Sequence, residues 1–258
     1  MSEITFDLAG YRCLLAALVG HGYTCRDYDA VVPERADLLL RHDIDMSISA
    51  ARRIAECEAE AEMFGHYFVL LRTEFYNPLS AAGLEDLRAI AAAGHRIGLH
   101  YDASLYPQDY DSLSRGAEWE CGLLEQGLGQ AVTTISFHRP SRALLGSAMP
   151  LAGRLHSYMP RFFSDIGYCS DSQGCWRFGA PLDHDAVRQG RAIQLLTHPI
   201  WWTASAELSV VEKLENFALS RYEATRVALG ENCTPFQSHQ QLQGGLGVRL
   251  EKRRGASE

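Results

Sequence analysis

The fold is decided by the stretch Leu38-Leu39-Leu40-Arg41-His42-Asp43-Ile44-Asp45, an apolar run that ends in alternating charged residues. Side chains at positions i and i+2 of a strand point to the same side, so Asp43 and Asp45 share one face and Ile44 takes the other. Helical spacing follows at once, in Ala50, Ile54, Cys57, Ala61 and Phe64. A strand that passes directly into a helix is typical of an alternating α/β chain.

The same alternation continues outward in both directions. Further strands are predicted at 67–71, 97–101, 132–137, 162–168 and 193–197, and helices at 8–18, 84–94, 112–128 and from 208 onward. Alternating strands and helices predict a mostly parallel sheet, and at this chain length a barrel is favoured over an open sheet.

Composition excludes several classes of function. The chain has 258 residues and a net charge of −8, which argues against a nucleic-acid partner bound through its phosphates. No apolar run approaches the roughly 20 residues of a membrane-spanning helix, so no integral membrane segment is expected. Glu3 and Asp7 stand where a secretory signal would carry basic residues. Seven cysteines without a Cys-x-x-Cys pair favour a reduced, cytoplasmic location.

Polar residues gather where the predicted strands end, and in barrels that edge carries the working residues. They are Asp43, Asp45, His100, Asp102, His138, Arg139, Asp171 and His198. Two neighbouring carboxylates, such as Asp43 and Asp45, repel each other unless a cation or a shared proton lies between them. The competing interpretation is that they cap the next helix, which begins near Ser47.

The other strand ends also admit two interpretations each. His95 and His100 are five residues apart and therefore face opposite sides of a strand, so they are not expected to bind one ion together. His100 is either a metal ligand or a structural histidine. Arg139 could hold Asp43 with two hydrogen bonds, or it could form a weak surface ion pair.

Aromatic residues lie near the same strand ends. Tyr101, Trp176, Trp201 and Trp202 could form a platform for a sugar ring. Each of them could equally be a core aromatic.

Four motifs in order carry a family resemblance. They are Asp43-x-Asp45, Gly94-His95-x-Ile97-Gly98-x-His100, the Arg139-Pro140 corner and Leu196-x-His198-Pro199. Over residues 38 to 202 they resemble the polysaccharide deacetylase superfamily, that is, carbohydrate esterase family 4 and its nodulation-type chitooligosaccharide deacetylase group. The resemblance is strongest to the deacetylase-like proteins of bacterial surface-polysaccharide clusters.

The resemblance implies a fold and a set of roles. The fold would be α/β, a distorted, incomplete (β/α) barrel of the TIM type with about seven parallel strands, and the cofactor a divalent metal, most often zinc. Asp43 would be the catalytic base, and Asp45 and His100 metal ligands. Arg139 would orient the base, Asp171 would brace the base or the opposite histidine, and His198 would be the general acid.

The sequence departs from the family at the second motif. The family has two metal-binding histidines four residues apart, whereas the residue four after His100 is Ser104. His138 is the first candidate for the third ligand, and Asp102 and an extra water are the alternatives. His42 is adjacent to Asp43 and so has the opposite parity, meaning that its side chain faces the other side of the strand. It is therefore less favoured as the third ligand.

Together with these residues, the resemblance implies a metal-dependent hydrolase that removes an N-acyl group, such as acetyl, from an amino sugar or a sugar-containing intermediate in surface-polysaccharide biosynthesis. One alternative is a deacetylase-like protein that only binds a glycan, and another is an amidohydrolase acting on a non-sugar amide. Residues 1–243 are predicted to form one barrel domain. Residues 244–258 are expected to be a basic tail, solvated or anion-binding.

Overall fold

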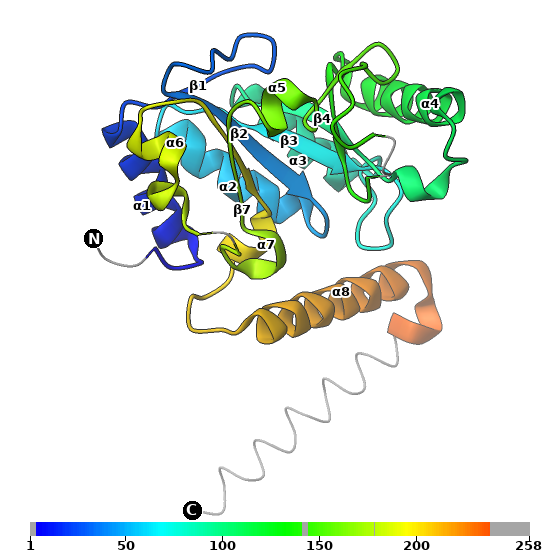
Figure 1. Cartoon of the computed structure of the whole chain (residues 1–258). Helices are drawn as coiled ribbons and strands as arrows, with labels where there is room; N and C mark the ends of the chain where they lie inside the picture. Colours follow the sequence, from blue (N-terminus) through cyan, green and yellow to red (C-terminus); the bar gives the residue numbers. More distant parts are fainter. Residues whose placement is uncertain (1–3, 141–143, 178, 238–258) are drawn as a thin grey trace, which may run out of the picture. The chain divides into compact units, whose positions relative to one another are not determined.

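Seven parallel strands follow one another across the sheet in the order β6-β5-β4-β3-β2-β8-β7. Figure 1 labels β2, β3, β4 and β7 among them. Their bounds are β2 Asp37–Ile44, β3 His66–Leu70, β4 Arg96–Tyr101, β5 Thr134–Phe137, β6 Leu155–His156, β7 Gly167–Ser170 and β8 Ile193–Thr197. The short β1 (Thr24–Cys25) pairs with the first residues of β2. The sheet curls into a half-barrel and does not close, since its end strands β6 and β7 are not paired with each other in the described residues. The predicted distorted, incomplete barrel is confirmed.

The computed structural model describes residues 4–140, 144–177 and 179–237. The chain divides into one unit over Met1–Val210 and a second over Val211–Glu258. The second unit contains most of α8 (Val210–Asn232), which confirms the helix predicted from 208 onward. The predicted tail 244–258 lies outside the described residues, and the domain range 1–243 stays a prediction. None of the helices described is long and apolar enough to cross a bilayer.

Four long helices cover one face of the sheet. They are α1 (Leu8–Gly20), α2 (Ile48–Glu60), α3 (Ala81–Ala92) and α4 (Tyr110–Leu128), and each contacts the next. Each begins at a side chain that accepts a backbone N–H three residues later, which satisfies a donor that the helix itself cannot pair. These caps are Asp7, Ser47, Ser80 and Asp109. Because Ser47 caps α2, Asp43 and Asp45 are left for another role.

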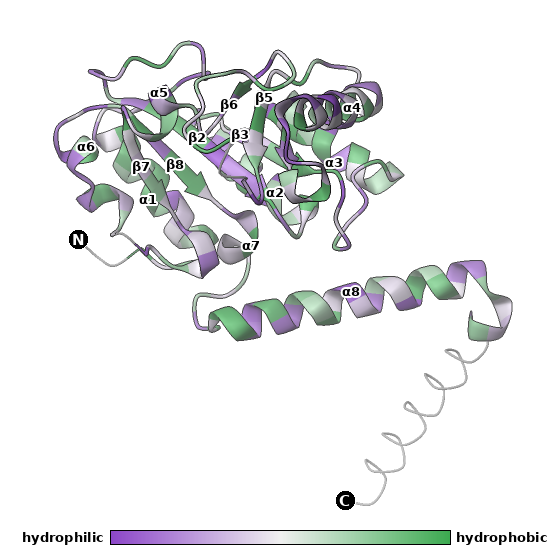
Figure 2. Cartoon of the chain, turned by 45° about the vertical axis from the view of Figure 1, so that its right-hand side comes forward, coloured by the Kyte–Doolittle hydropathy of each residue, from purple (hydrophilic) through white to green (hydrophobic). Residues whose placement is uncertain are grey.

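The opposite, concave face holds an apolar core below the polar strand ends. Its buried members are Tyr28, Leu39, Phe68, Met159, Phe162, Ile166 and Ala192. Leu39 comes from β2 and has the same parity as Arg41 and Asp43, so the polar residues continue this face toward the carboxyl edge of the strand. Figure 2 shows that edge of β2 in purple within a largely green sheet.

The strand predicted at 162–168 is wrong in its first half. Residues Pro160–Phe163 form the short helix α5, and β7 begins only at Gly167. Proline fits the first turn of a helix, where its missing N–H costs nothing, and Phe162 packs into the concave core. β1 and β6 have two residues each, too few for a period to be read. The short helices α6 (Asp185–Arg188) and α7 (Pro199–Trp202) flank β8.

Candidate metal centre

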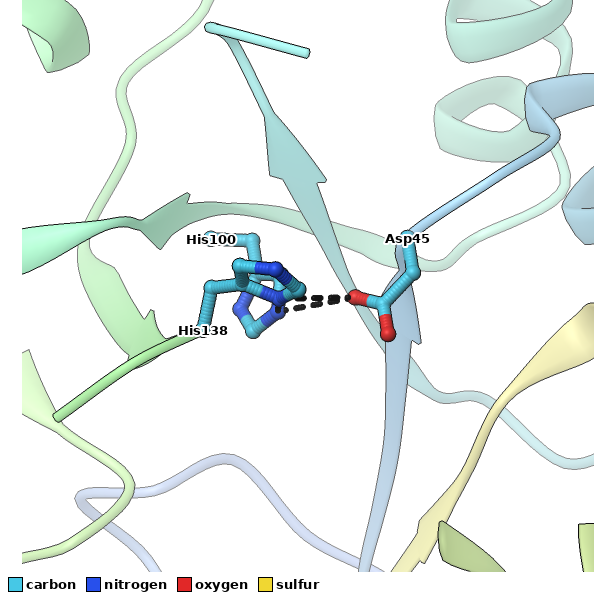
Figure 3. Close-up of side chains that lie close together, drawn as sticks. All are labelled: Asp45, His100 and His138. Atoms are coloured by element: carbon cyan, nitrogen blue, oxygen red, sulfur yellow. Dashed lines mark hydrogen bonds and ion pairs between the residues drawn. The ribbon is translucent and has the colours of Figure 1, made fainter. Parts of the chain in front are cut away.

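Three donor atoms meet at the carboxyl edge of the sheet. His100 Nε2 lies 3.0 Å from Asp45 Oδ1, and His138 Nδ1 lies 3.3 Å from the same oxygen. The two ring nitrogens are 3.2 Å apart. Figure 3 shows both imidazoles turned toward the carboxylate. The three residues follow or end β2, β4 and β5, which lie near one another in the sheet.

The donor set fits a divalent cation. Asp45 Oδ1 is buried and has no hydrogen-bond partner in the residues described, although two ring nitrogens face it. Lone pairs that converge on one point repel each other unless a cation or a proton lies between them. Two imidazole nitrogens and one carboxylate oxygen are a donor set that zinc takes in catalytic sites, with a further position left open.

Ser136 orients the His100 ring. The Ser136 hydroxyl donates to Asp43 Oδ1 over 3.0 Å, so its oxygen must accept at the 3.1 Å contact with His100 Nδ1. His100 therefore carries its proton on Nδ1 and keeps the Nε2 lone pair for a metal. Sequence reasoning missed Ser136, although it stands two residues before His138 and shares its parity.

Arg41 binds the candidate base. Its Nε donates to Asp43 Oδ1 over 3.0 Å and its Nη2 to Asp43 Oδ2 over 2.8 Å, with both side chains buried. Burial opposes ionisation of Asp43, but the Arg41 guanidinium beside it more than offsets burial and lowers the pKa of the carboxyl group. Asp43 Oδ2 also lies 3.8 Å from His100 Nε2, beside the donor trio.

The expected pairing of Arg139 with Asp43 is wrong. The Arg139 side chain is 67% exposed, and the carboxylate paired with it in the described part of the chain is that of Asp102, at 3.8 Å. Arg41 takes Asp43 because it precedes it by two residues on β2 and so faces the same side. The signal was present in the sequence, in the quoted run 38–45.

Asp171 braces His198, which decides between the two roles that the resemblance left open. Asp171 Oδ1 lies 2.6 Å from His198 Nδ1, and both carboxylate oxygens accept the His198 backbone N–H at 3.0 Å. Burial opposes protonation of His198, but Asp171 more than offsets it and raises the pKa of His198 to about 9. His198 is therefore protonated at neutral pH, with Nε2 at 3.8 Å from Asp45 Oδ2.

Most of the predicted aromatic platform is wrong. Tyr101 and Trp202 are 0% exposed and Trp201 is 6% exposed, so none offers a ring face to a sugar. Tyr101 has the opposite parity to His100, and its hydroxyl donates to the Leu113 carbonyl. The Trp202 indole N–H donates to Asp171 over 2.7 Å.

A different ring contacts Arg41, the residue that binds the candidate base. Tyr158 is half-buried, and its hydroxyl accepts from Arg41 Nη2 over 3.2 Å. Its ring packs on Phe163, which packs on Tyr168. No spacing in the sequence marked these three. Trp176 is half-buried against Phe6 and Trp202, and its substrate role stays a prediction.

The two other candidates for the third ligand point elsewhere. Asp102 Oδ1 accepts from the backbone N–H of Ser104 over 3.0 Å and from its hydroxyl over 2.6 Å. His42 lies on the helix-facing side of the sheet, with Nε2 at 2.7 Å from Glu58 Oε1. His138 therefore remains the third donor.

No protein-family model and no curated protein sequence matches the chain. Among solved structures, a deacetylase from Streptococcus pyogenes, PplD, gives a TM-score of 0.44 at 13% identity, covering 80% of this chain and 84% of that one. A family 4 carbohydrate esterase from Bacillus anthracis gives 0.42 at 15%, covering 82% and 86%. A family 4 pseudoenzyme from the same organism gives 0.40 at 14%, covering 75% and 63%. The function is therefore argued from the chain's own residues.

Proposed function

We propose that the protein is a metal-dependent hydrolase that removes an N-acyl group, such as acetyl, from an amino sugar or a sugar-containing intermediate. One observation carries this proposal. An ionised carboxylate and a protonated histidine flank a convergent trio of metal-binding donors at one edge of the sheet. Hydrolysis of an amide needs those parts: a base for water, an acid for the leaving nitrogen, and an electrophile.

Asp45, His100 and His138 would hold the cation, and the donor set favours zinc. When bound, such an ion lowers the pKa of a water molecule and polarises an acyl carbonyl group.

Asp43 accepts the proton of the attacking water. Arg41 and Ser136 keep its carboxylate charged and fixed in direction. A bond forms between the water oxygen and the acyl carbon, and the bond from that carbon to nitrogen breaks. An amine is a poor leaving group as an anion, so it needs a proton as it departs.

His198 supplies that proton. Asp171 holds its Nδ1 side, which leaves the Nε2 proton directed toward the side of the site where Asp45 lies. The products are the free carboxylic acid and the amino sugar. Each general acid or base contributes typically about 10²–10⁴-fold to such a rate.

The sugar part of the proposal is supported by the motif resemblance and by the half-buried ring of Tyr158 beside Arg41, which continues into the half-buried rings of Phe163 and Tyr168. A cytoplasmic role in surface-polysaccharide biosynthesis extends the resemblance. The absence of disulfides among the seven cysteines, all of them described, is in keeping with that location.

The test combines metal analysis with a substrate panel. The purified protein is loaded with zinc, and acid release is measured from N-acetylated monosaccharides, chitooligosaccharides, nucleotide-linked N-acetylsugars and acylated amines without sugar. We expect about one metal per chain and release from at least one sugar substrate, abolished by a chelator and restored by zinc. Bound metal with no turnover of any substrate in the panel would contradict the hydrolase proposal.

A second candidate is an amidohydrolase acting on a non-sugar amide. The burial of Tyr101, Trp201 and Trp202 favours it, because three of the four rings expected to stack on a sugar are unavailable. Turnover of the sugar-free amines alone would select this candidate.

A further inference from the structure

A second polar cluster lies behind the candidate site, on the helix-facing side of the sheet. Its centre is Glu58 of α2, which is fully buried. The Tyr11 hydroxyl donates to Glu58 Oε1 over 2.5 Å and the Tyr67 hydroxyl to Oε2 over 2.7 Å. His42 Nε2 lies 2.7 Å from Oε1. We call these four residues the Glu58 cluster.

The cluster holds a charge where an apolar core would be the simpler solution. Burial opposes ionisation of Glu58, but His42 and the Tyr11 hydroxyl more than offset it and lower the pKa of the carboxyl group. His95 Nδ1 lies 3.4 Å from Glu58 Oε2. This nitrogen accepts the Gly65 backbone N–H, so it carries no proton on the side that faces Glu58. Buried charged groups of this kind often fix one arrangement of the chain rather than add stability.

The cluster is linked to β8 by one hydrogen bond. His42 Nδ1 and Thr197 Oγ1 are 2.7 Å apart, and both residues are buried. They are register partners across the parallel pair β2 and β8. Asp43 directly follows His42 and His198 directly follows Thr197, so the two residues assigned as base and acid stand just beyond this link on the opposite face.

We propose that Glu58, His42 and Thr197 are positioning residues that hold the carboxyl ends of β2 and β8 in a single arrangement. They thereby set the separation between Asp43 and His198. This inference rests on the proposed function for its catalytic readout. A displacement of about 1 Å in a catalytic group can cost on the order of 10²-fold in rate, so a modest change of register would be visible in kcat.

Gly65 shows how closely the chain packs around this link. A Cβ atom at Gly65 would lie 2.6 Å from His42 Nε2 and 2.9 Å from Glu58 Oε2. The residue before β3 is therefore one that leaves room for the His42 ring and the Glu58 carboxylate. The cluster is therefore closely packed as well as charged.

The first test uses Thr197→Val, which removes the hydroxyl at nearly constant volume, and Thr197→Ser, which keeps it. Thr134→Val is the matched control, because Thr134 is also buried but begins β5, at the other end of the strands. We expect Thr197→Val to lower kcat by about tenfold or more, with KM changed less than about twofold. Thr197→Ser and Thr134→Val should stay close to the wild type. Equal kcat values for the Val and Ser variants would overturn the proposal.

The second test needs no catalysis. The His198 backbone N–H donates to Asp171 over 3.0 Å, so its hydrogen exchange reports how firmly the end of β8 is held. We expect Thr197→Val and Glu58→Gln to speed that exchange by about tenfold, while the amide of Phe68 in β3 is unchanged.

The two tests separate the possible failures. No hydrolysis by the wild type, with His198 exchange still sensitive to Thr197→Val, would reject the proposed function and keep the positioning role. Unchanged exchange at His198 would overturn the positioning role whatever the activity. Equal acceleration at His198 and Phe68 would also overturn it, because the cluster would then only stabilise the whole fold.

Discussion

Arg41 and Asp43 are two residues apart on β2, buried, and joined by two hydrogen bonds. Lysine cannot reproduce that planar, two-bonded contact. We expect Arg41→Lys to keep the charge near Asp43 but lower kcat/KM by about 10- to 100-fold, because the carboxylate loses its fixed direction. Steady-state kinetics on the substrate identified by the panel would measure this.

Arg139→Ala is the control for that variant. Arg139 is largely exposed, and its removal should change kcat/KM by less than about threefold, as for a weak surface pair. A larger loss in Arg139→Ala than in Arg41→Lys would return the base-orienting role to Arg139.

His198 should be protonated well above the usual range of a histidine. Its pKa is raised to about 9 by Asp171, against about 6.5 in an unfolded chain. The pairing therefore stabilises the fold fully below about pH 6.5, and this contribution is lost as the pH rises through about 9. In Asp171→Asn the pKa of His198 should fall toward its ordinary value. NMR titration of the ring in metal-free protein tests this, and an unshifted pKa in the variant would contradict it.

At the residue scale, parity along the strands predicted much of the site. It placed Asp43 with Asp45 and separated His95 from His100, as the structure shows. Arg41 and Ser136 were not predicted, because the pattern singled out polar residues at strand ends and these two lie inside their strands, on the face that carries the site. Strand alternation also explains why Tyr101 failed, whereas Trp201 and Trp202 lie in the helix α7 and are buried there. Tyr101 alternates with His100 and must face the helices.

At the scale of elements, close contact between strands leaves no room for a side chain at Gly98 of β4. A Cβ atom there would lie 2.5 Å from the Phe68 ring and 2.8 Å from the Thr134 carbonyl oxygen. Gly98→Ala should therefore lower the free energy of unfolding by about 1–3 kcal/mol, the usual cost of overpacking. Chemical denaturation would measure it.

The same substitution at Gly122 provides a control of opposite sign. Nothing lies within 4 Å of a Cβ atom built at Gly122, which is inside α4. Gly122→Ala should raise the free energy of unfolding by about 0.5–1 kcal/mol through helix propensity. If Gly122→Ala also destabilised the protein, the space around each Cβ position would not explain the two results.

Helices and strands long enough to show a repeated hydrophobic pattern could be predicted from the sequence. The short elements β1, β6 and α5 could not. The continuous apolar run before Arg41 and the helical face that follows it correspond to β2 and α2. The segment from Pro160 has apolar residues that suit either state, and the proline decided for a helical turn. β1 and β6 depend on neighbours distant in sequence, which no local pattern reveals.

At the scale of the whole molecule, the proposed cation would join the end of β2 to the ends of β4 and β5, which are separated from it in sequence by other strands and helices. Binding to the folded state alone stabilises it, by about 4 kcal/mol when the ligand is at 1,000 times its Kd. Zinc should therefore raise the melting temperature of the metal-free protein. His138→Ala should abolish the rise, and differential scanning calorimetry would show both.

His21→Ala is the control, because His21 is exposed at the end of α1 and is not one of the three converging donors. It should bind zinc as the wild type does. A zinc-dependent rise that survives in His138→Ala would mean that Asp102 or another group is the third ligand.

The fold class could be predicted at this scale from the alternation of strands and helices alone. The ligand set needed the positions of three strand ends together.

β2 carries different chemistry on its two faces, one residue out of step: Asp43 faces the donor trio, and His42 faces Glu58. A slip of one residue would turn Asp43 against Glu58, two buried carboxylates with no cation between them, and would leave an imidazole where the base belongs. A shifted strand register is thus destabilised by repulsion between buried charges as well as by lost apolar contacts. The polar residues that form the candidate site on this strand therefore also favour its correct register during folding.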